Sequence, residues 1–561
     1  MKILLISPPV EDFFFTPQRA YPLGILSIGT VLEEAGFSVK ILNCVEDYTK
    51  TTLPFPKRFS YLKRYYQPNK SPFCLFSHYY RFGLTNSQIS ECVKNFAPDI
   101  VGISANFSAY FKSACETAKL VKDIDNRIIV AMGGRVPTAR PDFVLSDKNV
   151  DFAVRGEAEY AFLKLCESIK QGKKNRAKGI CYRTKGDKNI ISKEIALIKD
   201  LNRLPVLNRK LINYRKYFFQ GNVFTSLLAS RGCLMKCGFC AIKEPFRYRK
   251  AEQIIKEIED CYSLGIRHFN FEDDTMNLHP EFEVLLDAMI QKYEGKIKIS
   301  FMSGLLRLNL NSIMREKLLK AGLTHIDLSI ASATKKVREK MKRRETPRGV
   351  FELGNFMAKR DVPAAVHFII GYPGQSFKDA VKDLHVIADE PVLLGPSIFY
   401  PVVESSVFDV LKEEYRIDER DYESFRSSAA FFDKSISRDR IFLTFYFSRI
   451  INFVKELAAR YVIKDGDLRK FLKNKLKKIS MKDDVVYPRA KYDKTILGMV
   501  ALKRLLEENA IYRIAEDKNN DKIEYRLKKE EFVSKKDVIT CLRGLKIKGR
   551  NGRMIYVSSH K

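Results

Sequence analysis

Apolar positions follow two alternating rhythms along the first 200 residues. Short apolar runs, such as the one at 3–6, are typical of buried strands, and apolar residues three or four positions apart are typical of helices. Strands are predicted at 2–7, 39–42, 99–104 and 128–132, with helices at 23–35 and 114–122. Because strands and helices alternate, this region is predicted to form a doubly wound, Rossmann-like parallel sheet.

Ligands of such a sheet bind at the loops that follow the carboxyl ends of its strands. Three of these loops carry small or turn-forming residues, and from them we expect cofactor contacts by Ser7, Pro8, Ser104, Gly133 and Gly134. No G-x-G-x-x-G motif occupies the first turn, so a dinucleotide site is disfavoured.

Strands and helices alternate through the central third, in about six strand–helix units. The predicted strands lie at 223–229, 267–274, 298–303, 325–330, 364–370 and 392–400. The predicted helices lie at 251–264, 281–292, 311–321, 335–341, 350–360 and 377–388. In an α/β barrel, such repeats bind their ligands at the C-terminal rim of the strands.

The remaining residues predict a mostly helical α+β region. A long amphipathic helix is predicted at 441–462, a second helix at 495–508, and a hairpin at 512–527 with its turn at 518–521. The apolar face of the long helix suits either a membrane surface or the preceding domain, and we favour packing on the domain. The expected domains are therefore 1–200, 201–425 and 426–561.

Residues 50–80 interrupt the N-terminal pattern with aromatic and basic side chains. Such a segment suits an anionic or stacked substrate, but it also suits an excursion that packs across its own domain. We favour packing.

Charge and cysteine content restrict the expected partners and compartment but do not predict a fold. A net charge of +32 suits an anionic partner, but the basic residues are dispersed and no nucleic-acid motif accompanies them, so nucleic acid is not favoured. No apolar stretch reaches the roughly 18 residues that span a bilayer. Eleven cysteines, of which three are clustered, fit a reducing cytoplasm, with peripheral membrane contact left open.

The three clustered cysteines are Cys233, Cys237 and Cys240, spaced C-x3-C-x2-C directly after the strand at 223–229. Thiolates bind Fe–S clusters, and three ligands would leave one iron of a cubane open to a small molecule. The alternatives are a disulfide with one spare thiol, or zinc. A disulfide is disfavoured without a secretory signal, and zinc lacks a nearby fourth ligand.

This cysteine loop resembles the signature of the radical S-adenosylmethionine (SAM) enzymes, and Phe239 matches the aromatic residue that precedes their last cysteine. The resemblance implies a partial (β/α)6 barrel and a [4Fe–4S] cluster on the three thiols. It also implies SAM on the fourth iron, reductive cleavage to a 5′-deoxyadenosyl radical, and an external electron donor such as flavodoxin or ferredoxin.

Residues 1–200 are similar to the cobalamin-binding domain of one radical SAM subfamily, on motifs that include Met132-Gly-Gly-Arg135 and the Arg-Gly-Glu ending at Glu157. The resemblance adds Glu157 to the expected cofactor contacts. Relatives often carry a His where this chain has Val136, and no Asp-x-His-x-x-Gly pattern supplies an axial ligand. Cobalamin is therefore expected without a protein His on cobalt; the alternative is a domain that has lost it.

Further rim positions match the radical SAM family. Asp273 and Asp274 resemble its acidic second-strand end and are the expected catalytic residues. SAM contacts are expected from Arg307, Ser332, Ile370 and Gly371. Two departures, Ala331 and Gln375 in place of frequent Glu residues, weaken the expected SAM contacts.

These resemblances imply a cobalamin-dependent radical SAM enzyme, with methylation of an unactivated carbon as the favoured reaction. SAM would then serve both as methyl source and as radical source. The alternatives are a radical SAM oxidase or cyclase with non-methylating or absent cobalamin, an RNA-modifying enzyme, and a non-catalytic regulator. The substrate is expected to be a small molecule, lipid or peptide.

Overall fold

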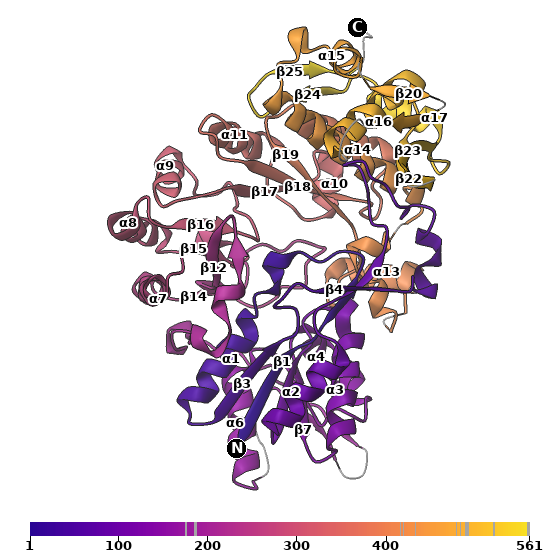
Figure 1. The fold of residues 1–561 in the computed structure, drawn as a ribbon. Helices are drawn as coiled ribbons and strands as arrows, with labels where there is room; N and C mark the ends of the chain where they lie inside the picture. The colour runs from indigo at the N-terminus through magenta and orange to yellow at the C-terminus, as the bar shows by residue number, and fades with distance from the viewer. Residues whose placement is uncertain are drawn as a thin grey trace.

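The structure is a computed structural model. It describes residues 1–173, 177–184, 188–415, 417–418, 420–431, 433–477, 479–482, 484–487, 493–519 and 522–557. Figure 1 shows an N-terminal α/β unit, an arc of strands and helices beside it, and a C-terminal group of helices at the far end of the arc.

The N-terminal unit is built on a seven-stranded sheet with the order β10-β9-β8-β7-β6-β1-β3. Five strands are parallel: β1 (Lys2–Ser7), β3 (Ser38–Asn43), β6 (Ile100–Ser104), β7 (Ile129–Gly133) and β8 (Phe152–Val154). The other two, β9 (Ile180–Arg183) and β10 (Asn189–Ile190), are antiparallel. Taken in chain order, the parallel strands run 2-1-3-4-5, the flavodoxin-like doubly wound order, whose ligand crevice opens beside the first strand.

Both faces of this sheet are covered, which explains the continuous apolar run in β1. Ile3 and Leu5 pack with α1 (Leu23–Glu34) and α6 (Ala158–Lys170). Leu4 and Ile6 pack on the other face with α2 (Asn86–Phe96) and α3 (Phe111–Ile124). The predicted doubly wound sheet is confirmed.

The central part contains the six predicted strands in parallel. One sheet holds β12 (Asn222–Leu227), β15 (His268–Phe271) and β16 (Lys298–Phe301), and a second holds β17 (Ile326–Ala331), β18 (Ala364–Ile370) and β19 (Leu393–Ile398). A bridge between Ile299 and Leu323 joins the two sheets. The associated helices are α7 (Ala251–Ser263), α8 (Phe282–Tyr293), α9 (Ser312–Lys320), α10 (Lys335–Lys340), α11 (Pro347–Ala358) and α12 (Phe377–Ala388). This is the predicted partial barrel.

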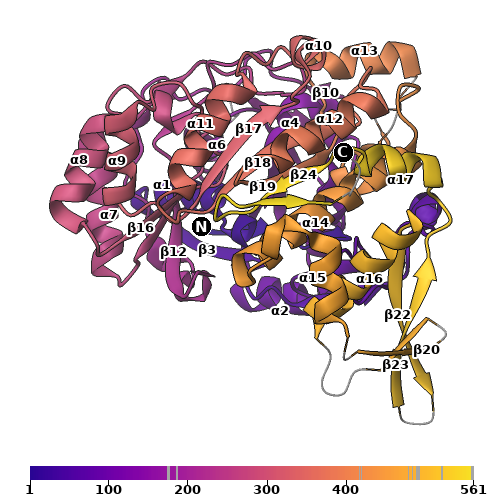
Figure 2. The same ribbon diagram turned by 90° about the horizontal axis from the view of Figure 1, so that it is seen from above.

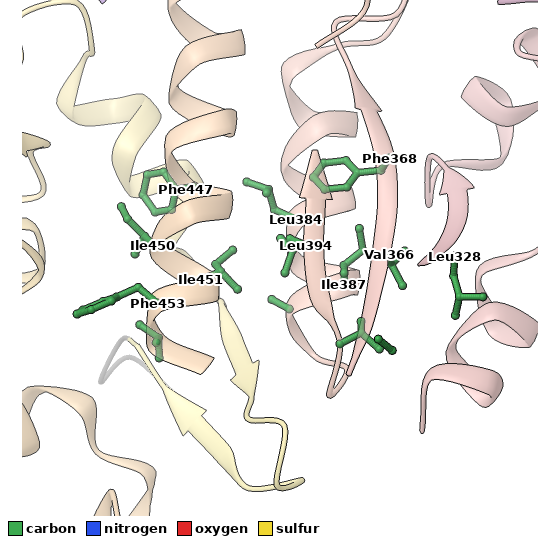
Figure 3. Packing of buried hydrophobic residues seen from close by; sticks show 14 of the residues in the cluster. Leu328, Val366, Phe368, Leu384, Ile387, Leu394, Phe447, Ile450, Ile451 and Phe453 are labelled. Carbon is green, nitrogen blue, oxygen red and sulfur yellow. The ribbon is translucent and has the colours of Figure 1, made fainter. Parts of the chain in front are cut away.

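Alternate residues of the barrel strands face in opposite directions. Leu328, Val366 and Phe368 point into the main hydrophobic core, together with residues of α12 and α14 (Figure 3). The intervening residues of the same strands, Asp327 and His367, therefore lie on the opposite, concave face of the barrel. That face carries polar groups instead of a packed core.

The C-terminal region covers the end of the arc. Its long helix α14 (Arg438–Arg460) buries one face against β19 and α12, so the predicted packing on the domain is confirmed. The other elements are α13 (Ser406–Tyr415), α15 (Leu468–Lys475), β20 (Ser480–Lys482), β21 (Val485–Tyr487), α16 (Lys494–Glu508), β22 (Tyr512–Asn519), β23 (Lys522–Lys529), α17 (Lys535–Leu542), β24 (Lys546–Lys548) and β25 (Met554–Tyr556). Figure 2 shows the hairpin β22–β23 projecting from this region.

The hairpin forms as predicted at 512–527, and part of its turn, 520–521, lies outside the described residues. In the described part of the chain, no helix has the length and apolarity needed to cross a membrane. The domain boundaries at 200 and 425 stay a prediction.

The aromatic segment at 50–80 packs on the C-terminal region. Tyr65 stacks on Phe442 of α14 with ring centroids 4.1 Å apart, and Phe73 meets Phe453 at 5.3 Å. Phe59 and Phe73 are buried in the same core as α14. The segment packs, as favoured, but its partner is a helix almost 400 positions further along the chain and not only its own domain.

Candidate active site

The three clustered cysteines lie on the loop that leaves β12, after the short strand β13 (Ser230–Arg231). All three are half-buried free thiols. Burial raises the pKa of Cys233 and Cys240, and the neighbouring thiols and Asp274 raise it further. Cys233 and Cys240 would therefore need a bound cation to stay thiolates.

The backbone of Gly238 fixes this loop to two other parts of the chain. Its N–H donates to the Met341 carbonyl at 2.9 Å, and its carbonyl accepts from Val407 N at 3.0 Å and Ser406 Oγ at 3.2 Å. Phe239 packs beneath the loop among Tyr372, Phe399 and their neighbours. The loop is thus held in place by α10, α13 and an apolar base.

Arg343 also lies beside the cysteines, and no sequence pattern had indicated it. Its Nη1 lies 3.7 Å from Cys237 Sγ, while Nη2 donates to Glu345 Oε2 at 2.8 Å and to the Ser329 carbonyl at 3.4 Å. Only 11% of its side chain is exposed. Arg343 belongs to a basic run after α10, and such runs usually lie on solvated faces, so the pattern could not single it out.

The two predicted catalytic acids have different surroundings. Asp273 is buried and accepts hydrogen bonds from Ala229 N at 3.1 Å and Ser230 N at 2.5 Å, so it braces the entry to the cysteine loop. Asp274 lines the cavity described below. Burial raises the pKa of each to about 6. Of the pair, Asp274 is the acid that a ligand can reach.

The predicted SAM contacts at the ends of β17 and β18 are joined by Asp383 of α12. Its carboxylate accepts from Ser332 Oγ at 2.9 Å and from Gln375 Nε2 at 3.0 Å, and Gln375 Oε1 accepts from Gly371 N at 2.7 Å. Burial raises the pKa of Asp383 to about 7. The Ser332 hydroxyl is therefore engaged within the protein, and Asp383 is a further residue that the sequence did not indicate.

The two remaining predicted SAM contacts differ in exposure. Ile370 is fully buried at the end of β18. Arg307 is exposed after β16, and its backbone N–H donates to Glu345 Oε1 at 2.7 Å. Arg307 and Arg343 thus converge on one carboxylate. Their assignment to SAM, like that of the other rim residues, stays a prediction.

A cavity of about 390 Å³ separates the N-terminal sheet from the cysteine loop. Ser104, Gly133, Gly134 and Glu157 line it, whereas Ser7 and Pro8 end β1 outside the lining. The barrel side contributes Ser230, Arg231 and Gly232 before the first cysteine, Glu244 after the last cysteine, and Asp274. The loops at 104 and 133–134 thus meet the barrel at one hollow.

Gly134 keeps one wall of this cavity free of side chains. Its φ is +121°, and a Cβ there would lie 2.5 Å from Asn106 Oδ1 and 2.9 Å from the Ala105 backbone. Only glycine suits this position. The turn after β7 therefore presents bare backbone to whatever the cavity holds.

Ion pairs connect the two sides of the cavity. Arg135 pairs with Glu244 at 2.7 Å, and Glu157 accepts from Arg247 at 2.9 Å. Arg231 pairs with Glu159 at 2.5 Å, and both are largely buried. These pairs join the N-terminal unit to the segments that flank the cysteines. The Glu157 carboxylate is consequently committed to a structural contact.

Comparisons with known proteins agree on both halves of this arrangement. The model of the radical SAM superfamily matches residues 227–387, and that of the B12 binding domain matches residues 77–165. An uncharacterized methyltransferase, PH0819 of Pyrococcus horikoshii, is 29% identical over 386 residues, covering 67% of this chain and 75% of that protein.

An anaerobic magnesium-protoporphyrin IX monomethyl ester cyclase of Rubrivivax gelatinosus is 23% identical over 352 residues, covering 60% of this chain and 62% of that protein. Among solved structures, the radical SAM methyltransferase TsrM from Kitasatospora setae superposes with a TM-score of 0.55 at 15% identity. The match covers 74% of this chain and 76% of TsrM, and at that identity it supports the fold alone.

The residues present fit the cofactors of these two domains. Three thiols on one loop supply three of the four ligands of a cubane and leave one iron for SAM. The bare turn at Gly134 opens on the crevice beside β1, where this sheet order binds its cofactor. In the described part of the chain, no group of three or more His, Cys, Asp or Glu side chains is arranged for a single metal ion. The chain thus combines a radical SAM domain with a B12-binding domain, and the cofactors of this pair of domains are a [4Fe–4S] cluster, SAM and cobalamin.

Proposed function

We propose that this enzyme transfers a methyl group from SAM, by way of cobalamin, to an unactivated carbon of its substrate. The cavity carries the proposal. Its walls include the cobalamin-side turns at Ser104 and Gly134 and the barrel-side residue Asp274. Asp274 also acts electrostatically on Cys233 and Cys240. A substrate between the two sites would therefore lie within reach of both.

When bound, the cluster and SAM supply a carbon radical and cobalamin supplies a methyl carrier. The protein's own residues hold and shield this chemistry. Cys233, Cys237 and Cys240 bind the cluster, and the Gly238 backbone fixes their loop. Arg343 places a positive charge beside Cys237.

Two carboxylates, Asp273 and Asp383, hold the segments at the ends of the barrel strands in place. Asp273 keeps the start of the cysteine loop in place, and Asp383 does the same for the strand ends after β17 and β18. Both carboxylates accept backbone N–H groups, so either could be replaced only with a loss of local order.

A radical oxidation or cyclisation is the alternative, since the Rubrivivax relative is named a cyclase. The same pair of domains hosts both outcomes, so the fold does not decide between them. We further propose flavodoxin or ferredoxin as electron donor, and a cytoplasmic location that suits an oxygen-sensitive cluster and eleven free cysteines.

The test is anaerobic reconstitution with iron, sulfide and hydroxocobalamin, followed by desalting and absorbance spectroscopy. We expect a cluster band and stoichiometric corrinoid in the same protein. Candidate substrates are then screened with SAM and a reductant. Methyl transfer releases S-adenosylhomocysteine together with 5′-deoxyadenosine. Release of 5′-deoxyadenosine with product but without S-adenosylhomocysteine would establish the alternative.

Alanine at Cys233, Cys237 or Cys240 should abolish both the cluster and SAM cleavage. Cys92→Ala is the matched control, because Cys92 is a half-buried thiol in the N-terminal unit, distant in the fold from the cysteine loop. Retained SAM cleavage in a loop variant would contradict the assignment of the cluster.

A further inference from the structure

Asp327 and His367 face each other on the concave side of the barrel, on the neighbouring strands β17 and β18. Asp327 Oδ1 lies 3.0 Å from His367 Nε2, and Oδ2 lies 3.5 Å from His325 Nε2. His325 Nδ1 lies 3.0 Å from Thr324 Oγ1. One carboxylate therefore joins two imidazoles, and none of these residues belongs to the cofactor contacts above.

The hydrogen bond to Asp327 decides which nitrogen of His367 is available. A carboxylate at Nε2 favours the proton on Nε2, which leaves Nδ1 with its lone pair in the neutral ring. Among the described residues, His367 Nδ1 has no hydrogen-bond partner. The imidazole is 47% exposed and Asp327 is 20% exposed, so the base is more accessible to a ligand than its carboxylate is.

The third strand, β19, fixes the position of the ring. A Cβ on Gly395 would lie 2.5 Å from His367 Nδ1 and 2.7 Å from Cε1. The ring therefore lies across Gly395, in space that any other residue would fill. Asp327 on one side and Gly395 on the other hold the imidazole in one orientation.

Polar side chains of β15 and β16 continue this face of the barrel toward the C-terminal ends of the strands. His268 Nε2 lies 2.9 Å from Ser300 Oγ, which donates to Asn270 Oδ1 at 3.1 Å. Asn270 Nδ2 donates to Glu272 Oε1 at 2.7 Å, next to Asp273 and Asp274. These side chains are mostly buried and hydrogen-bonded to one another, so they give this face a polar lining beneath the exposed His367 imidazole.

We propose that Asp327 and His367 form a proton-transfer site, in which His367 Nδ1 accepts a proton from an O–H or N–H group of the bound substrate. The substrate keeps the electron pair as an alkoxide, enolate or amine, and Asp327 stabilises the imidazolium. The substrate is thus a molecule with an acidic hydroxyl, enol or ammonium group near the methylated carbon. The substrate role rests on the proposed function, whereas the reactive imidazole does not.

Other titratable groups face this pair and enter its pH dependence. They are His325 on the other Asp327 oxygen, His268 in contact range of His325, and Lys298 at the start of β16. Both His268 and His325 meet the ring of Phe219, with centroids 5.0 and 5.8 Å away. Asp327 is the carboxylate bonded to His367, so its removal gives the sharpest test.

The first experiment measures imidazole reactivity in the reconstituted enzyme, without substrate. Diethyl pyrocarbonate acylates the unprotonated imidazole nitrogen, and mass spectrometry follows each histidine across pH 5–8. His78 is the internal control, because it is an exposed histidine whose ring nitrogen meets only the Ser77 hydroxyl. We expect His367 to react, and we expect Asp327→Asn, which removes the carboxylate that orients the ring, to lower the His367 rate several-fold.

Gly395→Ala supplies a second variant that keeps both partners. It should displace the ring and change the His367 rate several-fold while leaving His78 unchanged. An unreactive His367, or equal His367 rates in the wild type and Asp327→Asn, overturns the proposal whatever reaction the enzyme catalyses. Changed reactivity at His78 in Asp327→Asn would reveal a folding defect in that variant. The His367 rate in Gly395→Ala would then decide whether the proposal holds.

The second experiment follows product formation with the substrate found by the screen. His367→Gln should lower kcat/KM about 100-fold or more, and Asp327→Asn should lower it by a smaller factor, on the order of tenfold. A His367→Gln enzyme with the wild-type pH profile would contradict the proton transfer even if the imidazole is reactive. Absence of S-adenosylhomocysteine would contradict only the proposed methylation.

Discussion

The guanidinium of Arg343 lies 3.7 Å from the sulfur of Cys237, across 106 positions of sequence. Glu345 orients that guanidinium, and its burial weakens solvent screening of the charge. A fixed cation beside one cluster ligand stabilises the more negative, reduced cluster. The Arg343–Cys237 contact is therefore expected to raise the reduction potential of the cluster.

Arg343→Gln should lower the reduction potential of the cluster, on the order of 50 mV, because the reduced form loses a stabilising charge. Spectroelectrochemical titration of the reconstituted protein measures this shift. Arg344→Gln is the matched control, since Arg344 is the exposed neighbour. Equal potentials in both variants would show that the contact has no electrostatic effect.

Gly134→Ala should reduce corrinoid retention at least about tenfold while the cluster remains. The added Cβ would meet Asn106 and the Ala105 backbone at the cavity wall. Gly172→Ala is a suitable control, because Gly172 also has a positive φ but has no atom within 4 Å of an added Cβ. Absorbance after desalting gives both quantities. Unchanged corrinoid in Gly134→Ala would contradict the cofactor assignment of this turn.

Asp383 should make thermal stability depend on pH. Its pKa is raised to about 7 by burial, above the unfolded value of 3.8, so the folded state binds more protons between those values. The contribution of this group is therefore fully present below about pH 4 and is lost as pH rises to about 7. Relative to Asp383→Asn, the wild-type Tm should fall across this window. A difference in Tm that stays constant with pH would refute the assignment.

Lys455→Met should destabilise the C-terminal region by roughly 3 kcal/mol or more. The buried Lys455 ammonium donates to the carbonyls of Ala388, Glu390 and Lys548, and methionine would leave all three without a donor. Urea unfolding followed by fluorescence or circular dichroism measures the loss. Lys473→Met, at an exposed position of α15, should be close to neutral.

Much of the architecture follows from local pattern. The helix predicted at 377–388 has those same bounds in the structure, and the six barrel strands lie where the apolar runs predicted them. Regular alternation is a local property, so a sequence reports it directly. The cysteine loop was equally visible because its three ligands are close together along the chain.

The residues that the sequence missed are brought to the site from a distance. Asp383 reaches Ser332 from the middle of a helix 51 positions later, and its polar side chain resembles any solvated helix residue. Arg343 stands in a basic run, and Asp327 pairs with a histidine 40 positions away on the next strand. Each contact depends on which elements become neighbours, and periodicity does not carry that information.

The aromatic segment at 50–80 also constrains how the chain is made. Tyr65 and Phe73 find their partners on α14, which a ribosome releases only after the whole barrel. Until then the nascent chain carries an uncovered aromatic surface on its first domain, and a chain cut before α14 would carry it permanently. The N-terminal unit is therefore completed only after α14, in the C-terminal region, has been synthesised.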